Sequence, residues 1–101
     1  SHTVLIMMSE STCCANFIIK NEHGIHARPG AYIVNLLKPF NCAVKIANLS
    51  RNDHYVNAKS LMALMSLGIK NGHEVSVIFD GKDAQSALQK LSAEIENGLG
   101  E

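Results

Sequence analysis

The sequence of 101 residues contains no tryptophan and only five aromatic residues. Proteins that bind single-stranded nucleic acids stack the bases on exposed aromatic side chains, so this class of function is poorly supported. Nine Lys and Arg residues balance nine Asp and Glu residues, which leaves no overall positive charge to attract nucleic acid or an anionic membrane. We therefore expect no nucleic-acid partner, and any anion that binds must be held by a local site.

Long apolar runs are also missing. The longest, residues 4–8, is far shorter than the roughly 20 residues that a membrane-spanning helix needs. No secretory signal is recognisable. The three cysteines include the adjacent pair Cys13 and Cys14, a spacing that suits neither a disulfide framework nor a Cys-x-x-Cys zinc site. These features predict a cytoplasmic protein with reduced thiols and no membrane insertion, and we assign no role to the cysteine pair.

The composition is that of one folded domain. Apolar residues make up 47% of the chain and charged residues 18%, which is enough apolar material to fill a core. A chain of this length has little room for a second domain. The beginning of the chain does not resemble the rest, and we interpret residues 1–14 as an expression remnant and linker and residues 15–101 as the domain.

Hydrophobic periodicity predicts four strands and three helices. Strands are expected at residues 15–20, 43–48, 54–57 and 74–80. Helices are expected at residues 27–38, from Ser60 to a stop at Asn71-Gly72, and from Ala84 to a stop at Gly98. Because each strand alternates apolar and polar residues, the helices must cover one face of the sheet. The order β-α-β-β-α-β-α predicts an α+β open-faced β-sandwich, a four-stranded antiparallel sheet covered on one face by three helices.

One segment combines residues that suit the binding of phosphate. A histidine stands directly before the first predicted helix, residues 27–38, in the segment Gly24-Ile25-His26-Ala27-Arg28-Pro29-Gly30. The first amides of a helix have no partner within it and lie at the positive end of its dipole, so they bind anions. Arg28 adds a permanent cation with a planar set of donors, and Pro29 fixes φ for entry into the helix. Since the residue before proline avoids the α region, Arg28 itself is an alternative N-cap.

The chemistry of His26 allows two interpretations. A neutral imidazole is a nucleophile and forms covalent intermediates. A phosphoryl group on it would bring about two negative charges to the positive helix end and Arg28. In the simpler interpretation, His26 is a solvated side chain or a helix cap. Its position between a strand and a helix, with glycine on both sides, favours a reversible phosphoryl acceptor.

Two motifs give the chain a family resemblance. Gly24-Ile25-His26-Ala27-Arg28-Pro29 is similar to the active-site motif Gly-[Leu/Ile]-His-x-Arg-Pro of HPr, the histidine-containing phosphocarrier of the bacterial phosphoenolpyruvate-dependent sugar phosphotransferase system. The segment from Lys59-Ser60-Leu61-Met62 to Leu67-Gly68-Ile69 resembles the second HPr signature. The resemblance covers residues 15–101 and has the two motifs in the same order.

The resemblance implies a function. His26 would take a phosphoryl group on Nδ1 from phosphorylated enzyme I and pass it to an enzyme IIA domain of a sugar permease. Arg28 and the backbone of Ala27 would bind the phosphate. No cofactor is expected, since Mg²⁺ would serve enzyme I alone. The protein would be a transiently phosphorylated component of the transferase class and not a turnover enzyme on its own.

The segment from Glu22 to Gly30 and the closing residues Asn97 to Glu101 look most like the HPr-like domain of fructose-specific multiphosphoryl transfer proteins. In that subfamily an HPr-like domain shares its chain with a IIA domain, so we expect a domain taken from a longer protein, with fructose as the downstream sugar. His23 is a departure, because many HPr proteins have Asn there. It brings a second titrating group near His26.

The predicted second helix carries two further features. Ser60 stands where serine is a favoured N-cap. In many Gram-positive HPr proteins the matching serine is phosphorylated by a kinase, but we expect no such regulation, since fructose-type domains come mainly from organisms that lack this kinase. Leu61, Met62 and Met65 cannot all face the core. The resemblance implies that they dock enzyme I and IIA.

Other functions remain as alternatives. A regulatory HPr paralogue would act by binding proteins without carrying phosphate, but such paralogues commonly replace the histidine that is His26 here. A ferredoxin-like RNA-binding module is disfavoured by the zero net charge. No Cys or carboxylate neighbours complete a tetrahedral set of metal ligands with His23 and His26, so we expect no metal.

Overall fold

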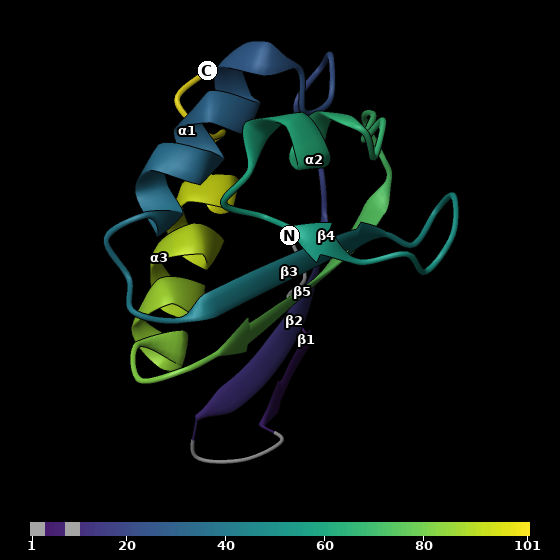
Figure 1. Ribbon diagram of the computed structural model, residues 1–101. Coiled ribbons are helices and arrows are strands. Elements are labelled where there is room, and N and C mark those ends of the chain that lie inside the picture. The colour runs from purple at the N-terminus through teal and green to yellow at the C-terminus, as the bar shows by residue number, and fades with distance from the viewer. Residues whose placement is uncertain (1–3, 8–10) are drawn as a thin grey trace.

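The structure is a computed structural model that describes residues 4–7 and 11–101. In these residues the chain forms five strands and three helices (Figure 1). The strands are β1 (Val4–Met7), β2 (Thr12–Ile18), β3 (Ala43–Asn48), β4 (Val56–Asn57) and β5 (Glu74–Asp80). The helices are α1 (Ala27–Leu37), α2 (Leu61–Met65) and α3 (Ala84–Glu96). None of the helices in this described part is long and apolar enough to cross a bilayer.

The strands form one antiparallel sheet in the order β1-β2-β5-β3-β4. Figure 1 shows α1 and α3 side by side over one face of the sheet, with α2 next to α1. The predicted α+β open-faced sandwich is therefore confirmed. Its four predicted strands and three helices are all present, and β1 adds a strand at one edge.

Part of the segment that we interpret as a remnant and linker, residues 1–14, belongs to the sheet. Val4–Met7 pairs with β2, from Val4 opposite Asn16 to Met7 opposite Cys13. Strand β2 begins at Thr12, three residues before the predicted start. An unpaired sheet edge offers free N–H and C=O groups to any extended apolar segment. Because this edge exists only in the folded sheet, the local sequence does not predict the pairing. Residues 1–3 and 8–10 of the predicted linker lie outside the described residues.

Two predicted elements are shorter in the structure. Helix α2 ends at Met65 and not at Asn71-Gly72. Gly68 has φ +57°, a left-handed conformation that turns the chain away from the helix, and Gly72 (φ +87°) serves the next turn, before β5. The strand expected at residues 54–57 keeps only Val56–Asn57.

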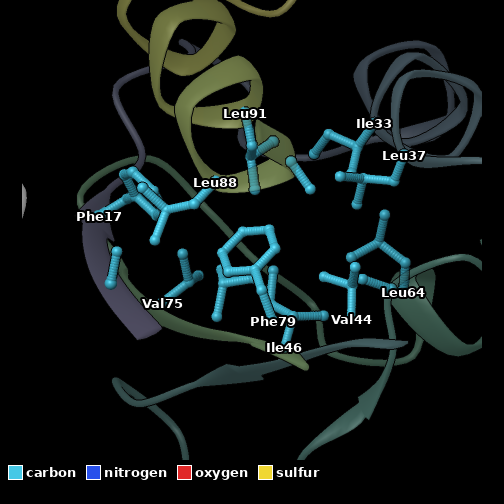
Figure 2. Packing of buried hydrophobic residues seen from close by; sticks show 14 of the residues in the cluster. Phe17, Ile33, Leu37, Val44, Ile46, Leu64, Val75, Phe79, Leu88 and Leu91 are labelled. Atoms are coloured by element: carbon cyan, nitrogen blue, oxygen red, sulfur yellow. The ribbon is translucent and has the colours of Figure 1, made fainter. Parts of the chain in front are cut away.

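The core lies between the sheet and the helices. Its side chains come from alternate positions of the strands and from the inner faces of the helices, as Figure 2 shows for Phe17, Val44, Ile46, Val75, Phe79, Ile33, Leu37, Leu64, Leu88 and Leu91. Burial of each such side chain contributes about 1.5–3 kcal/mol. In β5, Val75 and Phe79 are fully buried, as the alternation predicts. Ser76 points to the opposite face but is also covered there, where it accepts a hydrogen bond from the Tyr55 hydroxyl (2.9 Å).

Candidate functional site

The loop between β2 and α1 rests on the turn that follows α2. Ile25 N–H donates to the Ile69 carbonyl (2.9 Å), and the Ile25 side chain is buried. Gly24 has φ +69°, and a Cβ built on it would lie 2.2 Å from the Ile69 oxygen. Gly24 therefore satisfies two demands at once, a left-handed backbone and a close approach of two chain segments. This contact fixes the chain two residues before His26.

His26 is the N-cap of α1. Its backbone is extended (φ −86°, ψ −167°), its carbonyl accepts the Gly30 N–H (2.9 Å), and its side chain forms no capping hydrogen bond. The helix begins at Ala27 as predicted, so the alternative of Arg28 as the cap is wrong. The imidazole takes no part in capping the helix and is 42% exposed.

The groups around His26 suit an anion. Ala27 and Arg28 occupy the first two positions of α1, where backbone amides have no acceptor within the helix, while Pro29 has no N–H to leave unpaired. The Arg28 side chain is exposed, and within the described residues it forms no ion pair. Two amides and the positive end of the helix dipole thus lie directly after the histidine, and Arg28 adds an exposed guanidinium on the same first turn.

The other side of the ring contacts a carboxylate. His26 Nε2 lies 3.2 Å from Glu101 Oε1. A carboxylate only accepts hydrogen bonds, so the proton of a neutral His26 lies on Nε2 and the lone pair on Nδ1. The contact joins residues 75 positions apart, and periodicity gave no signal for it. The resemblance of the closing residues to a subfamily was the one hint in the sequence.

A folded-back C-terminal segment brings Glu101 to this place. Gly98, Leu99 and Gly100 all have positive φ values, and Leu99 is buried at 1% exposure. The Gly98 carbonyl accepts a hydrogen bond from Asn21 Nδ2 (3.0 Å), and Leu99 N–H donates to the Glu94 carbonyl (2.8 Å). The buried leucine therefore anchors the segment between α3 and the loop that leads to His26.

A surface contact between α1 and α3 lies next to this segment. The Tyr32 hydroxyl donates to Glu94 Oε1 (2.6 Å), and the Tyr32 ring flanks Gly100. The hydrogen bond from Tyr32 holds the pKa of the Glu94 carboxyl below its usual value, and the same bond raises the pKa of Tyr32. The Tyr32 side chain is partly exposed and the Glu94 side chain is 18% exposed, so the contact lies at the surface of the α1–α3 packing.

His23 is the second histidine of the site. Its ring centroid lies 6.2 Å from that of His26, with an angle of 69° between the ring planes. Beside it is an open hollow of about 400 Å³ whose lining includes Glu22, Glu96 and Glu101. The lining also includes Lys20, so side chains of both charge signs border the hollow. In the described part of the chain, no three His, Cys, Asp or Glu residues are placed to hold a metal ion.

The apolar residues predicted for docking lie next to the histidine site. Met62 is 85% exposed, Leu61 is 38% exposed, and Met65 is half-buried. We call these three residues the α2 patch. A Cβ built on Gly30, in the first turn of α1, would lie 2.5 Å from Met65 Cε, so α2 packs directly against the beginning of α1.

Ser60 is the N-cap of α2. Its Oγ accepts a hydrogen bond from the Ala63 N–H (3.2 Å). We expect Ser60→Ala to lower the free energy of unfolding by about 1 kcal/mol, because this amide loses its acceptor. Urea denaturation measures the change, and Ser60→Asp, which keeps a capping oxygen, is the control. An unchanged midpoint for Ser60→Ala would show that the cap contributes nothing.

All three cysteines are free thiols in the structure. Burial raises the pKa of the Cys13 thiol, and burial likewise raises that of Cys42. A thiol with a raised pKa is a poor nucleophile. Cys13 and Cys42 therefore add no reactive thiolate to the site.

Comparison with known proteins identifies the family. A family model described as "PTS HPr component phosphorylation site" matches residues 14–97. The chain is 44% identical over 92 residues to the multiphosphoryl transfer protein of Haemophilus influenzae, covering 91% of this chain and 18% of that protein. It is 36% identical over 95 residues to the phosphocarrier protein HPr of Chlamydia trachomatis, covering 94% and 84% of the two chains.

Solved structures agree with this result. The crystal structure of HPr from Thermoanaerobacter tengcongensis is similar at a TM-score of 0.81 and 35% identity, over 87% of this chain and 96% of that one. HPr from Bacillus anthracis is similar at a TM-score of 0.74 and 32% identity, over 81% and 94% of the two chains. The chain belongs to the HPr family, the phosphocarriers of the phosphotransferase system. It spans only 18% and 22% of the length of the first two multiphosphoryl transfer proteins that it matches, those of Haemophilus influenzae and Vibrio cholerae.

Proposed function

We propose that this domain accepts a phosphoryl group on His26 Nδ1 from phosphorylated enzyme I and passes it to an enzyme IIA domain. The observation that carries the proposal is the contact of His26 Nε2 with Glu101, which leaves the Nδ1 lone pair for the reaction. As Nδ1 attacks phosphorus, the N–P bond forms and the bond to the donor breaks, so no proton has to leave the imidazole. Glu101 holds the unphosphorylated ring in the tautomer that has its lone pair on Nδ1, and the Nε2 proton stays in place as the N–P bond forms.

The phosphoryl group then adds charge next to the beginning of α1. The amides of Ala27 and Arg28 and the Arg28 guanidinium are the donors that would stabilise it. Such groups bind a dianion without enclosing it, because His26 remains exposed at the surface. An exposed, locally stabilised phosphoryl group suits a carrier, since the next acceptor needs in-line access to phosphorus.

We further propose that the acceptor is an IIA domain of the fructose type, on the same natural chain. The similarity to multiphosphoryl transfer proteins supports this proposal, because this chain covers only a small part of their length. The cytoplasmic location and the absence of a cofactor on this domain stay predictions. A regulatory role without phosphate transfer is the alternative, and the presence of an exposed His26 argues against it.

A labelling experiment tests the function. The protein is mixed with enzyme I, Mg²⁺ and phosphoenolpyruvate labelled with ³²P, and the labelled protein is treated with acid or base. We expect a phosphate that is stable in base and labile in acid, with an ³¹P and ¹⁵N NMR signature of substitution at Nδ1. Absence of label with active enzyme I would contradict the carrier function.

The α2 patch provides a second test of the proposal. We expect Met62→Glu to raise the KM for transfer from enzyme I by about tenfold, because a charge replaces the most exposed apolar side chain of the α2 patch. Met62 is 85% exposed, so the free energy of unfolding should change by only about 0.5 kcal/mol. Met62→Leu is the matched control and should transfer at the wild-type rate. An unchanged KM for Met62→Glu would rule out docking through this patch.

A further inference from the structure

A buried amide side chain stands at the end of β3. Asn48 is 1% exposed, yet every hydrogen-bonding group of its side chain has a partner. Its Nδ2 donates to the Leu67 carbonyl (3.1 Å) and contacts His73 Nδ1 (3.0 Å), and its Oδ1 accepts the Ser50 N–H (3.1 Å). Because an unpaired polar group at this depth is costly, these three contacts fix the orientation of the amide.

The ring of His73 completes the network. His73 Nδ1 also lies 3.0 Å from the backbone nitrogen of Lys70. A backbone amide can only donate, so Nδ1 carries no proton and accepts hydrogen bonds from both Lys70 and Asn48. One nitrogen atom thus ties the turn after α2 to the end of β3. His73 itself is held by its backbone, since its carbonyl accepts the Ile19 N–H (3.0 Å).

This turn is the support on which the His26 loop lies. Ile69, immediately before Lys70, accepts the hydrogen bond from Ile25 N–H, and the backbone of both residues closely approaches Gly24. Figure 1 shows the turn after α2 next to the loop that leads into α1. A displacement of the turn would therefore displace the chain directly before His26.

The same turn also continues from the α2 patch. Leu67, whose carbonyl Asn48 holds, lies two residues after the end of α2 at Met65. The turn is thus joined to the docking helix at one end and supports the phosphorylation loop in its middle. Its position sets the distance and angle between the reacting histidine and the surface that binds partners.

We propose that His73, through Nδ1, is a positioning residue for phosphoryl transfer: it holds the turn at residues 67–70 so that His26 lies in the correct place relative to the α2 patch. The inference rests on the proposed carrier function. Transfer between two proteins requires in-line geometry, and small displacements of the acceptor lower the rate of the chemical step more than they lower binding. Loss of the His73 acceptor should therefore lower the kcat of transfer from phosphorylated enzyme I and leave the KM nearly unchanged.

Three variants separate this role from a general effect on stability. His73→Ala removes the acceptor. His73→Asn keeps one, because the Asn Oδ1 is attached to Cγ as Nδ1 is in histidine. His54→Ala is the matched control, since His54 is an exposed histidine in the loop between β3 and β4 and its side chain lies outside the network. Each protein is assayed with phosphorylated enzyme I, and its amide hydrogen exchange is followed by NMR.

We expect His73→Ala to lower kcat by about tenfold with KM nearly unchanged, and His73→Asn and His54→Ala to transfer at about the wild-type rate. The amides of Ile25 and Lys70 should exchange faster in His73→Ala alone. The amide of Val77, in the centre of the sheet, should not, because global stability is preserved.

Two results would overturn the proposal: a wild-type kcat for His73→Ala, or a loss in His73→Asn as large as that in His73→Ala. Failure of the proposed function is distinguishable, because the wild-type protein would then take no label before any substitution is made. The exchange of the Ile25 amide would still decide, in that case, whether His73 holds the loop.

Discussion

Replacement of His26 by alanine should reduce the phosphoryl label from phosphoenolpyruvate and enzyme I to background. His26 is the side chain at the site that combines an exposed nucleophilic nitrogen with the positive end of a helix. The substitution should leave the fold intact, because the side chain makes no capping hydrogen bond and is 42% exposed. The loss of label measured by scintillation counting, with circular dichroism as a check of folding, therefore reports on chemistry alone.

His23 supplies the control for this experiment. It is also an exposed histidine, its ring centroid is 6.2 Å from that of His26, and it precedes the helix. It lacks the position at the N-cap of α1 that gives His26 its electrostatic support. We expect His23→Asn to keep the label. If the label survives in His26→Ala and disappears in His23→Asn, the phosphoryl group is on His23, and the assignment to His26 is contradicted.

Replacement of Gly24 by alanine should be among the most destabilising single changes in the protein. At φ +69° an alanine is strained by about 1–2 kcal/mol. In addition, its Cβ would lie 2.2 Å from the Ile69 oxygen and 2.6 Å from the Lys70 Cα, and backbone atoms cannot rotate out of the way. The two effects together should cost about 3–5 kcal/mol. Urea or thermal denaturation measures this loss.

Gly72→Ala separates the two contributions. Gly72 also has a left-handed backbone (φ +87°), but a Cβ built there meets no atom within 4 Å. We expect it to cost about 1–2 kcal/mol, the strain alone. Equal losses for the two variants would mean that the contact with Ile69 has little energetic weight and that the loop before His26 can shift.

The candidate site around His26 was predictable because the residues that form it are neighbours in the sequence. Glycine, histidine, arginine and proline stand within a few residues of one another, and the start of α1 at Ala27 follows from the proline and the apolar positions behind it. The exposure of Leu61 and Met62 was predictable because the apolar residues of the second helix cannot all face the core. Patterns of this kind depend on neighbours in sequence, which is why they were visible without a structure.

Other features depend on where distant segments meet. The pairing of Val4–Met7 with β2 uses an edge of the sheet that exists only after folding. The early end of α2 at Met65 depends on Gly68 in a left-handed conformation and on the turn that this residue begins, whereas the sequence pattern continued to Asn71-Gly72. In each case the local pattern was compatible with two outcomes, and packing selected one of them.

The sequence by itself determined the α+β class, the family and the histidine, because alternating strands, amphipathic helices and one clustered motif are all short-range patterns. The tertiary structure alone decided what surrounds that histidine. It brought Glu101 to Nε2 across 75 positions by burying Leu99, and it placed the turn held by His73 under Ile25. The physical reason is that hydrogen bonds between distant residues form only where burial of apolar side chains has already fixed the chain.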